Sequence, residues 1–476
     1  MGKTSSVAGT PASHPGFDAE ERPGRAAILD CVHCGLCLPT CPTYLMTGLE
    51  TASPRGRVYL IRSVEEGQGR ISPVFVKHLD QCLGCLACQT ACPSGVSYGN
   101  LLEAARGQIE RQYARAAGDR AWRLLLLQLL PHPRRMRPLI GLLYWYQRLG
   151  VARLVRTAGL LDRLFPKLAR MEALLPVVPP PSERQPMEDH IPALGARRGR
   201  VGLLSGCVQP FVLPGINRAT ARVAAAAGYE VVTPRDQGCC GAMHLHTGHL
   251  DTAREMARRL IATFDETRVD LVLANAAGCG AAMKSYGHLL RDDPAWCERA
   301  AAFSARVRDV SELLGGVAWN GALRPLPLTV TYHEACHLAH GQRIRQEPRS
   351  LLRQIPGVRL VELTESDLCC GSAGVYNLLE PAMSGDLLRR KVERIRDTGA
   401  SVVAMGNIGC LLQVRLGLSQ AGLPIRAVHV VELLDWALHG GADGDGPPTV
   451  AGSADARSTT PAHLNNPTDR GVIDGR

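Results

Sequence analysis

The stretch CVHCGLCLPTCP at residues 31–42 returns in the same pattern as CLGCLACQTACP at residues 82–93. In each, three cysteines are separated by two residues, and a fourth cysteine follows three residues later, directly before a proline. Two-residue gaps wrap a tight turn, so the first three thiolates can face three corners of one cube. The fourth cysteine lies on the next turn and points away. This spacing is typical of bacterial [4Fe–4S] sites and predicts a ferredoxin-type module over residues 21–105.

The fourth cysteine of each run has its own assignment. In two-cluster ferredoxins it binds the other cluster, so the sequence predicts two [4Fe–4S] clusters with crossed ligands. Zinc sites are the alternative, but zinc usually pairs two C-x2-C elements across a longer gap. The helical patterns at 58–67 and 72–80 favour a helical two-cluster module. The predicted ligands are Cys31, Cys34, Cys37 and Cys92 for cluster 1 and Cys82, Cys85, Cys88 and Cys41 for cluster 2, with Pro42 and Pro93 completing the two cofactor-binding runs.

Residues 197–440 contain an internal repeat. Each half reads apolar strand, cysteine, helix, strand, Cys-Cys-Gly, helix, strand, cysteine. Alternation of strands and helices predicts two α/β domains with largely parallel sheets, over 197–320 and 321–440. Sites in such sheets collect at the carboxyl ends of strands, where all of these cysteines are expected. The two sets are Cys207, Cys239, Cys240 and Cys279, and Cys336, Cys369, Cys370 and Cys410.

The Cys-Cys-Gly turns present two sulfurs side by side. Gly241 and Gly371 would permit a positive φ or a close approach there. A vicinal disulfide or buried free thiols are the alternatives. Two copies at matched spacing favour ligation, so each set is expected to hold a further iron–sulfur cluster or a metal. Cys297 has no counterpart in the repeat and is expected to be an ordinary cysteine.

The string HEACH at residues 333–337 matches the H-E-x-x-H signature of zinc proteases. That signature requires a helix, so that both histidines share one face. Here the apolar strand TVTY runs directly into His333. The first half keeps the cysteine, as Cys207, without any histidine beside it. We therefore expect Cys336 to carry the chemistry, with His333 and His337 either near a cluster or simply polar residues at the end of a strand.

The length, charge and composition of the chain limit its location and its partners. It has 476 residues, 17 cysteines, a formal charge of +10 and 4% aromatic residues, which argues against a nucleic-acid partner. The first 20 residues contain no apolar signal segment, so reduced thiols and a cytoplasmic location are expected. Residues 1–20 and 441–476 are predicted to be disordered tails. Residues 106–196 are predicted to be a basic helical segment followed by a Pro-rich linker.

Within that segment, residues 121–170 carry ten Lys or Arg and one acidic residue, Asp162, between apolar residues at helical spacing. No apolar run is long enough to span a bilayer. A basic amphipathic helix can lie in a membrane interface. The commoner alternative is that its apolar face packs on the ferredoxin module.

The combination of a twin [4Fe–4S] module and two Cys-Cys-Gly domains resembles the iron–sulfur subunits of bacterial glycolate oxidases. The resemblance covers about residues 25–435. Relatives include the iron–sulfur subunits of lactate-utilising and anaerobic glycerol-3-phosphate dehydrogenases, and the heterodisulfide reductases are more distant. The stretches that carry it are CVHCGLCLPTCPTYLMTG, SPRGR, HLDQCLGCLACQTACPSGVSYGNLLE, GCVQP, GCCGAMHLHTGH, YHEACHLAHGQ, LCCGSAGVYNLLEP and GNIGC.

The resemblance implies a division of labour. FAD-containing partner subunits would oxidise a 2-hydroxy acid, and this chain would pass the electrons to a membrane acceptor such as quinone, at the inner face of the cell membrane. No catalytic residue is predicted in this chain, which has no nucleotide-binding glycine motif and no convincing triad. The alternatives are an iron–sulfur subunit of a lactate or glycerol-3-phosphate dehydrogenase, a thiol/disulfide reductase, or a zinc-bound scaffold. The sequence does not name the hydroxy acid.

One departure concerns the last cysteine of each set. In the heterodisulfide reductase relatives this element is C-x-x-C, but here Ala276 and Asn407 stand at its first position. Each set therefore offers four thiolates rather than five. One ordinary cluster, a smaller cluster or an empty site is the expected consequence.

Overall fold

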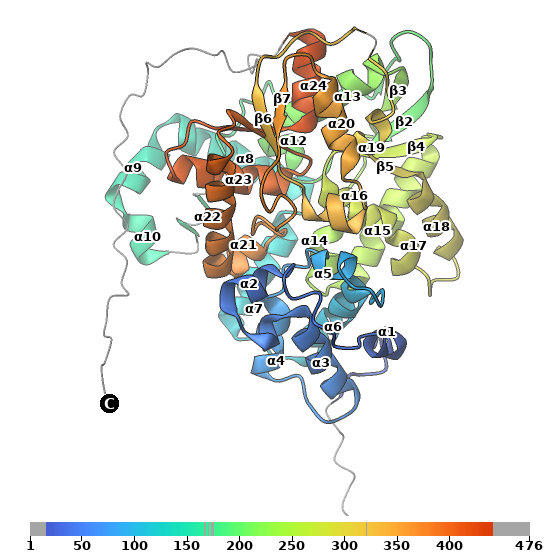
Figure 1. Ribbon diagram of the computed structural model, residues 1–476, viewed down its shortest axis with the longest axis vertical. Coiled ribbons are helices and arrows are strands. Elements are labelled where there is room, and N and C mark those ends of the chain that lie inside the picture. The colour runs from blue at the N-terminus through green and yellow to red at the C-terminus, as the bar shows by residue number, and fades with distance from the viewer. Residues whose placement is uncertain (1–15, 166–167, 170, 173–175, 320, 441–476) are drawn as a thin grey trace, which may run out of the picture.

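The computed structural model describes residues 16–165, 168–169, 171–172, 176–319 and 321–440. It contains a helical module, a set of linker helices and two α/β domains (Figure 1). The helical module lies below both α/β domains in this view, and linker helices α8, α9 and α10 lie along one side. This is the predicted α+β multi-domain architecture, in which a helical ferredoxin module precedes two repeated domains, and it is confirmed.

Short helices build the ferredoxin module. Proline occupies the first position of α2, α3 and α4, where its missing N–H is not needed. The hydroxyls of Ser53 and Ser72 cap α3 and α4 by accepting hydrogen bonds from backbone N–H groups. The helices are α1 (Arg25–Leu29), α2 (Pro42–Thr47), η1 (Glu50–Ala52), α3 (Pro54–Glu65), α4 (Pro73–Asp80), α5 (Ala87–Thr90) and α6 (Tyr98–Gln112).

Residues 16–20, which were expected to belong to a disordered tail, pack on the ferredoxin module. Residues 1–15 and 441–476 lie outside the described residues, but Phe17 is buried and its ring lies 6.1 Å from that of Phe75. The Asp18 N–H donates to the Gln108 side chain over 2.9 Å. The Gln108 side chain also donates to the Glu20 carbonyl over 2.7 Å, and Arg111 pairs with Asp18 at 3.0 Å. A buried aromatic ring and several polar contacts with α6 therefore hold the segment at 16–20 against the module.

The basic segment forms α7 (Ala117–Leu129), α8 (Pro133–Arg148), α9 (Val151–Ala158) and α10 (Leu160–Leu164). α7 contacts the ferredoxin module through the ion pair of Arg123 with Asp80 at 3.0 Å, which does not test the expected packing of an apolar face. The apolar face of α8 packs elsewhere: Met136 and Ile140 are buried in one cluster with Phe211 of the first α/β domain. Within the described residues, no helix is long and apolar enough to cross a bilayer.

The first α/β domain has a five-stranded sheet in the order β1-β3-β2-β4-β5. β1 comes from the Pro-rich linker and pairs antiparallel with β3, whereas the other pairs are parallel, with Val201 opposite Val231. The elements are β1 (His190–Ile191), β2 (Gly199–Leu203), α12 (Gln209–Val212), α13 (Pro214–Ala226), β3 (Tyr229–Val232), α14 (Ala242–His246), α15 (Leu250–Glu266), β4 (Leu271–Ala274), α16 (Ala277–Lys284), α17 (Tyr286–Leu289), α18 (Cys297–Arg306), β5 (Val307–Asp309) and α19 (Val310–Leu314).

The second α/β domain repeats the parallel part of this topology. Its four strands run in the order β7-β6-β8-β9, with Val330 opposite Leu360. The predicted parallel sheets are therefore confirmed in both halves. The elements are β6 (Thr329–Tyr332), the π-helical turn η2 (His337–Gly341), α20 (Gln346–Gln354), β7 (Arg359–Val361), α21 (Tyr376–Leu379), α22 (Pro381–Asp397), β8 (Val402–Met405), α23 (Ile408–Gln420), β9 (Arg426–His429) and α24 (Val430–His439).

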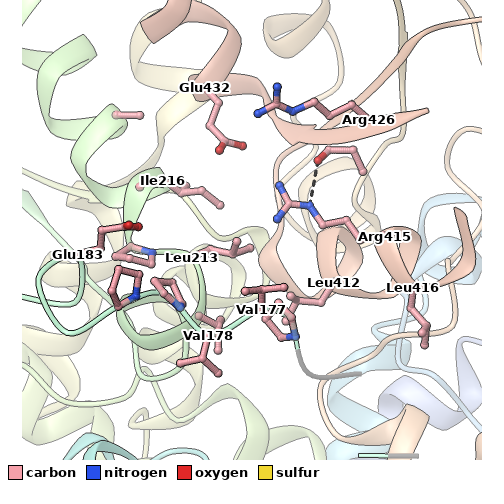
Figure 2. A pocket seen from close by; sticks show the side chains of 18 of the residues that line it. Val177, Val178, Glu183, Leu213, Ile216, Leu412, Arg415, Leu416, Arg426 and Glu432 are labelled. Atoms are coloured by element: carbon pink, nitrogen blue, oxygen red, sulfur yellow. Dashed lines mark hydrogen bonds between the residues drawn. The ribbon is translucent and has the colours of Figure 1, made fainter. Parts of the chain in front are cut away.

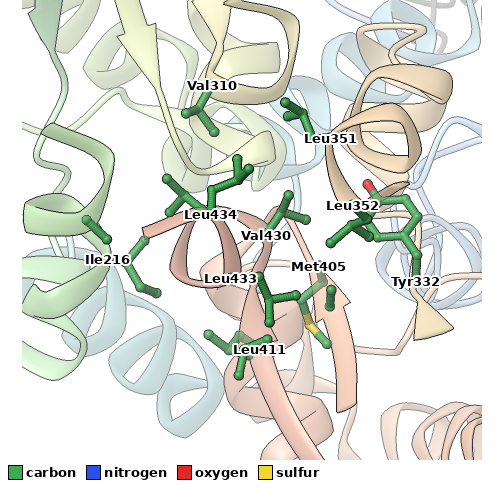
Figure 3. Packing of buried hydrophobic residues seen from close by; sticks show 14 of the residues in the cluster. Ile216, Val310, Tyr332, Leu351, Leu352, Met405, Leu411, Val430, Leu433 and Leu434 are labelled. Carbon is green, nitrogen blue, oxygen red and sulfur yellow. The ribbon is translucent and has the colours of Figure 1, made fainter. Parts of the chain in front are cut away.

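The two α/β domains share one core. Leu433 and Leu434 of α24 belong to the same buried cluster as Ile216 of the first domain and Met405 of the second (Figure 3). The backbone N–H of Ala277 also donates to the Gly406 carbonyl across the boundary, over 3.1 Å. The ends of β4 and β8, which lead to the last cysteine of each set, are thereby fixed next to each other.

Candidate metal centres and the cavity between them

The two ferredoxin cysteine runs have the same backbone geometry. In the first run, His33 and Gly35 have positive φ values of 55° and 86°. The equivalent residues of the second run, Gly84 and Leu86, both have φ of 63°. Left-handed residues on both sides of the middle cysteine turn the chain sharply twice, so the three thiols of a run converge. Two of these four residues are not glycine, and such strain is typical of functional loops.

Thiols of the two ferredoxin runs lie close to one another. Burial raises the pKa of Cys31, and Cys92 and Cys34 lie close enough to raise it further. Burial likewise raises the pKa of Cys88, with added contributions from Cys85, Cys82 and Cys41. Cys92 thus lies near Cys31 of the other run, and Cys41 lies near the first three cysteines of the second run as well as near Cys37 of its own. The crossed ligand sets stay a prediction. All 17 cysteines are free thiols, so these sets offer the four thiolates that a [4Fe–4S] cluster requires.

The two ferredoxin sets differ in burial. The cysteines of the second set are all buried, whereas Cys34 of the first is exposed. Apolar side chains surround Cys34 at the surface: Val32 is 67% and Leu36 is 59% exposed. The first set therefore lies at the surface beneath an apolar patch, and the second lies inside the protein.

A buried arginine borders the second set. Arg57 is 1% exposed, and its Nη1 lies 3.9 Å from the Cys41 sulfur. Its Nε donates to the His78 carbonyl over 2.7 Å. Burial raises the pKa of the Cys82 thiol, but the guanidinium groups of Arg57 and Arg106 outweigh burial and hold that pKa below its usual value. Arg57 was not predicted as a site residue, although it lies in the quoted stretch SPRGR.

The cysteines of both repeats lie at the carboxyl ends of their strands, as expected. Gly241 and Gly371 have φ values of 77° and 88°. A Cβ on Gly371 would lie 2.6 Å from the Ser384 carbonyl oxygen, so this turn accepts only glycine. Both roles foreseen for these glycines, positive φ and close approach, are present in the structure.

Within each repeat the thiols contact one another in chain order. Contacts with Cys207 and Cys240 raise the pKa of Cys239, and contacts with Cys336 and Cys370 raise that of Cys369. Cys279 lies beside Cys240, and Cys410 lies beside Cys370. Four thiols converge at each centre, which fits a metal or a cluster. We call these groups centre 1 (Cys207, Cys239, Cys240 and Cys279) and centre 2 (Cys336, Cys369, Cys370 and Cys410).

Centre 2 lies against the second ferredoxin set. Cys85 and Cys336 are packed in one buried cluster, and the proximity of Cys336 adds to burial in raising the pKa of Cys85. The Tyr376 hydroxyl donates to the Gln81 carbonyl over 3.0 Å, directly before the second cysteine run. These contacts fix the second ferredoxin set beside centre 2.

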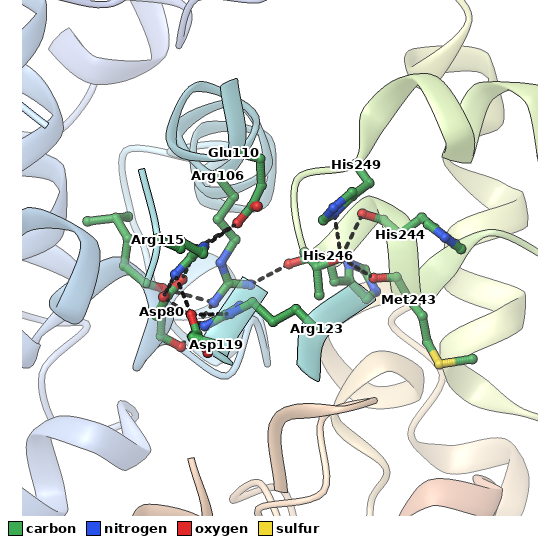
Figure 4. Close-up of polar contacts among 12 residues, drawn as sticks. Asp80, Arg106, Glu110, Arg115, Asp119, Arg123, Met243, His244, His246 and His249 are labelled. Carbon is green, nitrogen blue, oxygen red and sulfur yellow. Dashed lines mark hydrogen bonds and ion pairs between the residues drawn. The ribbon is translucent and has the colours of Figure 1, made fainter. Parts of the chain in front are cut away.

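Arg106 of α6 ties the module to the first α/β domain. Its Nη1 donates to the His246 carbonyl over 2.7 Å, and its Nη2 donates to the carbonyls of Leu79 and Cys82 over 2.8 and 2.6 Å (Figure 4). Glu103, also on α6, lies 3.1 Å from His246 Nδ1. The ferredoxin module is therefore joined to both α/β domains.

His246 also contacts a residue of centre 2's surroundings, His337. Its ring stacks on that of His337 with 5.0 Å between centroids, and His337 Nδ1 lies 3.8 Å from the Cys336 sulfur. Burial lowers the pKa of His337, but Cys336 and Glu103 outweigh burial and raise that pKa above its ordinary value. The predicted proximity of His337 to a cysteine site is present, whereas the roles of Glu103 and His246 had no sequence signal.

Centres 1 and 2 open on one cavity of about 920 Å³. Its wall includes all eight thiols of the two centres and Cys82 of the ferredoxin module. The remaining wall is mostly apolar and includes Leu129, Met136 and Leu143 of the linker helices. A cluster bound at either centre would occupy part of this chamber and border the rest.

A second cavity, of about 1580 Å³, lies apart from the thiols (Figure 2). Val177 and Leu213 border it on one side, and Leu412 of α23 borders it on the other. On that side the Arg415 Nε donates to the Ala427 carbonyl over 3.0 Å. No cysteine occurs among its described lining residues, so it is not part of the cysteine sites.

The HEACH segment does not have protease geometry. β6 ends at Tyr332, His333 follows it directly, and η2 begins only at His337. The two histidines therefore do not share one helical face. The residues that replace the fifth cysteine also differ: Ala276 carries no polar group, whereas the Asn407 side chain donates to the Cys410 sulfur over 3.4 Å.

Comparison with known proteins identifies the family. Family models match the chain in three regions: a 4Fe-4S dicluster domain over residues 27–96, the linker region of the glycolate oxidase iron-sulfur subunit over 118–175, and a cysteine-rich domain over 201–284 and 330–415. The linker match falls on the basic helical segment. The cysteine-rich matches fall on the two α/β domains.

Similar proteins extend over most of the chain. The probable glycolate oxidase iron-sulfur subunit of Bacillus subtilis is 41% identical, covering 87% of this chain and 95% of its own length. The glycolate oxidase iron-sulfur subunit of Escherichia coli is 34% identical, covering 86% and 93%. A CoM/CoB fumarate reductase chain of Methanothermobacter marburgensis is 32% identical over 52% of this chain and 48% of its own. The resemblance read from the sequence is confirmed, and the chain belongs to the family of glycolate oxidase iron–sulfur subunits, the electron-transfer subunits of an oxidoreductase.

Proposed function

We propose that this chain accepts electrons from an FAD-containing subunit that oxidises glycolate and delivers them to a quinone. Iron–sulfur clusters supply one-electron transfer when bound by such cysteine sets. The proposed ligands are the eight ferredoxin cysteines, for two [4Fe–4S] clusters, and the four thiols of each repeat, for a further cluster or metal. The observation that carries the proposal is the order of burial, from an exposed set to a buried set to centre 2.

Electrons enter at the surface around Cys34. This thiol is exposed, and Val32 and Leu36 extend from the same loop into solvent. Apolar side chains beside an exposed redox site suit a protein partner, because a docked partner covers them and brings its own cofactor close. We assign this surface to the flavoprotein subunit, since that subunit is the electron donor.

The interior step of the path is the contact between Cys85 and Cys336. Thiols in one buried cluster leave no room for a layer of protein between the groups they bind. The chain contributes position here: the hydrogen bonds made by Arg106 and Tyr376 fix the ferredoxin module on both α/β domains. We propose that this chain only conducts electrons and has no substrate-oxidising site of its own.

Electrons leave through the 920 Å³ cavity. Its mixed wall of thiols and apolar linker residues suits an apolar redox carrier such as a quinone. The linker helices also expose large apolar side chains, including Leu142, Trp145, Leu149 and Leu154. With Arg134, Arg135 and Arg137 on α8, this surface suits peripheral binding to an anionic leaflet. We therefore propose a cytoplasmic protein bound at the inner face of the cell membrane.

The docking surface for the flavoprotein is tested by reconstitution with the flavoprotein subunits. The Val32→Asp/Leu36→Asp double variant should keep its iron but lose reduction by the flavoprotein in the presence of glycolate. Leu194→Asp, which changes another exposed leucine, is the matched control and should behave as wild type. Lactate and glycerol 3-phosphate, each with their own flavoproteins, test the substrate. Normal reduction of the double variant would refute the docking surface.

The membrane assignment has a separate test. The purified chain should float with anionic vesicles at low salt, and substitution of Arg134, Arg135 and Arg137 by Glu should abolish flotation. Leu142→Ser/Trp145→Ser should weaken it. Equal flotation of the Glu variant, or no flotation of the wild type, would assign the basic segment to a partner subunit instead.

A further inference from the structure

The ring nitrogen Nε2 of the buried His333 has no role in the contacts described so far. The residue is fully buried, and its Nε2 has no hydrogen-bond partner of good geometry among the described residues, only the Cys370 thiol close by. One ring nitrogen of His333 and the sulfurs of Cys370 and Cys410 all lie within 4.8 Å of one another. Buried polar atoms without a partner are rare and call for a ligand or a functional reason.

The other ring nitrogen defines the protonation of the ring. His333 Nδ1 lies 3.1 Å from the Ser366 carbonyl oxygen, which can only accept a hydrogen bond. Nδ1 must therefore carry the proton, which leaves a lone pair on Nε2 in the neutral imidazole. Metal-binding histidines have this arrangement, because a backbone carbonyl that accepts the second N–H fixes the ring and its tautomer.

The Ser366 carbonyl is itself held in place. It accepts hydrogen bonds from the Glu334 N–H over 3.2 Å and from Lys391 Nζ over 3.3 Å. Glu334 is in turn paired with Arg349 at 2.7 Å. The acceptor that orients the His333 ring is thus fixed by buried neighbours, so the direction of Nε2 is fixed as well.

Centre 1 has no equivalent group. The residue three positions before Cys207 is Leu204, whereas the residue three positions before Cys336 is His333. Leu204 is buried in one apolar cluster with Cys207 and Cys240. Both repeats therefore have the four thiols, but only the second has an imidazole three residues before its first cysteine.

We infer that His333 is a ligand, through Nε2, of the metal or cluster held by centre 2. This rests on the proposal that the repeats bind a metal or a cluster. Centre 2 would then have mixed thiolate and imidazole ligation, with His333 supplying a fifth protein ligand, while centre 1 keeps thiolates alone. Zinc and iron both bind imidazole together with thiolates, and a tetrahedral zinc ion would take His333 with three of the four thiols. Imidazole in place of thiolate raises the potential of an iron–sulfur centre.

The experiment uses the full chain, purified without oxygen from cells given ¹⁵N-histidine, in a Cys240→Ala background that removes a thiol from centre 1. Iron and zinc are counted per chain. Nitrogen ligation is read by pulsed electron paramagnetic resonance for iron or by X-ray absorption for zinc. We expect metal beyond that of the ferredoxin clusters and a bound nitrogen. His333→Ala should remove the nitrogen signal and lower occupancy of centre 2 at least tenfold.

His340→Gln is the matched control. His340 is a buried histidine on the same segment, but both of its ring nitrogens already have partners, including Thr90 at 3.1 Å. Its variant should keep both metal and nitrogen signal. If His333→Ala does not fold, His333→Cys provides the test, and it should keep the metal and lose the nitrogen signal.

The failures are distinguishable. Metal in centre 2 with no bound nitrogen, or an unchanged nitrogen signal in the His333 variants, would overturn this inference alone. If the Cys240→Ala protein and the wild type both lack metal beyond the ferredoxin clusters, the proposal that the repeats bind metal fails, and this inference fails with it.

Discussion

The two cysteine-rich repeats have the same order of parallel strands, the same four thiols and the same left-handed glycine, yet the surroundings of their centres differ. Next to centre 2 lie His333, Asn407 and the buried Lys391. At the corresponding positions centre 1 has Leu204, Ala276 and Leu260. Leu260 corresponds to Lys391 because each is the eleventh residue of its helix, α15 and α22 respectively. The two copies share the thiols, and these three polar side chains occur in the second copy alone.

The two centres also differ in their position in the molecule. Centre 2 is packed against Cys85 of the ferredoxin module. The cysteines of centre 1 pack against described residues of their own domain and line the shared cavity. A group that exchanges electrons with a neighbouring cluster needs a potential matched to it. Polar neighbours and hydrogen bonds to sulfur set that potential. We therefore expect centre 2 to be the electron-receiving copy.

The largest predicted effect separates the two centres by function. Cys336→Ser should lower glycolate-dependent quinone reduction by more than about 100-fold, because a hydroxyl is a poor ligand for a soft metal and even changes beyond the ligands cost 10–100-fold. Cys207→Ser should lose the metal of centre 1 but keep more of this activity, since centre 2 also lines the cavity. Steady-state assays with a quinone analogue and with a dye that accepts from the flavoprotein measure both.

The dye is the control. Reduction of the dye should be unchanged in both variants, which would show that the flavoprotein is intact. Equal loss of quinone reduction in the two variants would break the comparison and place the two centres in one obligatory series.

The second prediction concerns a substitution that gives centre 1 a histidine at the position of His333 in centre 2. Leu204→His gives centre 1 the imidazole that centre 2 already has, at a site buried beside Cys207 and Cys240. If a metal or a cluster is bound there, a second nitrogen ligand should appear in its spectrum, and metal affinity at centre 1 should change by about 10–100-fold. Leu204→Asn, polar but a weaker ligand, is the control and should add no nitrogen signal. An unchanged spectrum in Leu204→His would mean that the imidazole cannot reach the metal from this position.

The repeats also differ at the end of their last strand. Asp309 caps α19, and His429 caps α24, each in a capping box. Both residues are fully buried, and burial moves their pKa values in opposite senses: Asp309 is raised to about 7 and His429 is lowered to about 4. His429 Nε2 lies 2.8 Å from the Asn275 carbonyl, and its Nδ1 accepts from the Val431 N–H, so a second proton would break the cap.

The third prediction follows from these signs. His429 contributes stability that is complete above about pH 6.5 and is lost as the pH falls towards 4, about 1.4 kcal/mol per pH unit and about 3 kcal/mol in all. Asp309 contributes stability that is complete below about pH 4 and is lost as the pH rises towards 7. In His429→Asn, the decrease in the free energy of unfolding between about pH 6.5 and 4 should therefore be smaller than in wild type. In Asp309→Asn, the decrease between about pH 4 and 7 should be smaller.

Anaerobic thermal unfolding of each variant, compared with wild type at every pH from 5 to 8, measures these slopes. The difference between variant and wild type is used because acid also attacks bound clusters. Parallel pH profiles of wild type and both variants would show that neither cap titrates in this range.

The strand-end positions of the repeat cysteines could be predicted from the sequence, because strand–helix alternation is a local property of the chain. The crossed ferredoxin ligand sets, which come from C-x2-C spacing, stay a prediction. Sequence reasoning did not find Arg57, Glu103 or His246, since each reaches its partner only through folding; Glu103 and His246 are 143 residues apart. For His333 the sequence suggested only proximity to a cluster. The orphaned Nε2 and the carbonyl bonded to Nδ1 became visible only with atoms in place.

The smallest predicted effect tests one hydrogen bond. Asn407 donates to the Cys410 sulfur, and its Oδ1 accepts from the Gly278 N–H over 3.3 Å, so it is oriented by the first domain. A donor to a ligand sulfur stabilises the reduced, more negative state. A net hydrogen bond of about 1 kcal/mol corresponds to about 40 mV for one electron. Asn407→Ala, which copies Ala276 of centre 1, should therefore lower the potential of an iron centre 2 by about that amount in a redox titration. Ala276→Gly, which changes the same position of centre 1 without adding or removing a donor, should leave both potentials in place. An upward shift in Asn407→Ala would mean that the Asn407 oxygen, rather than its N–H, faces the sulfur.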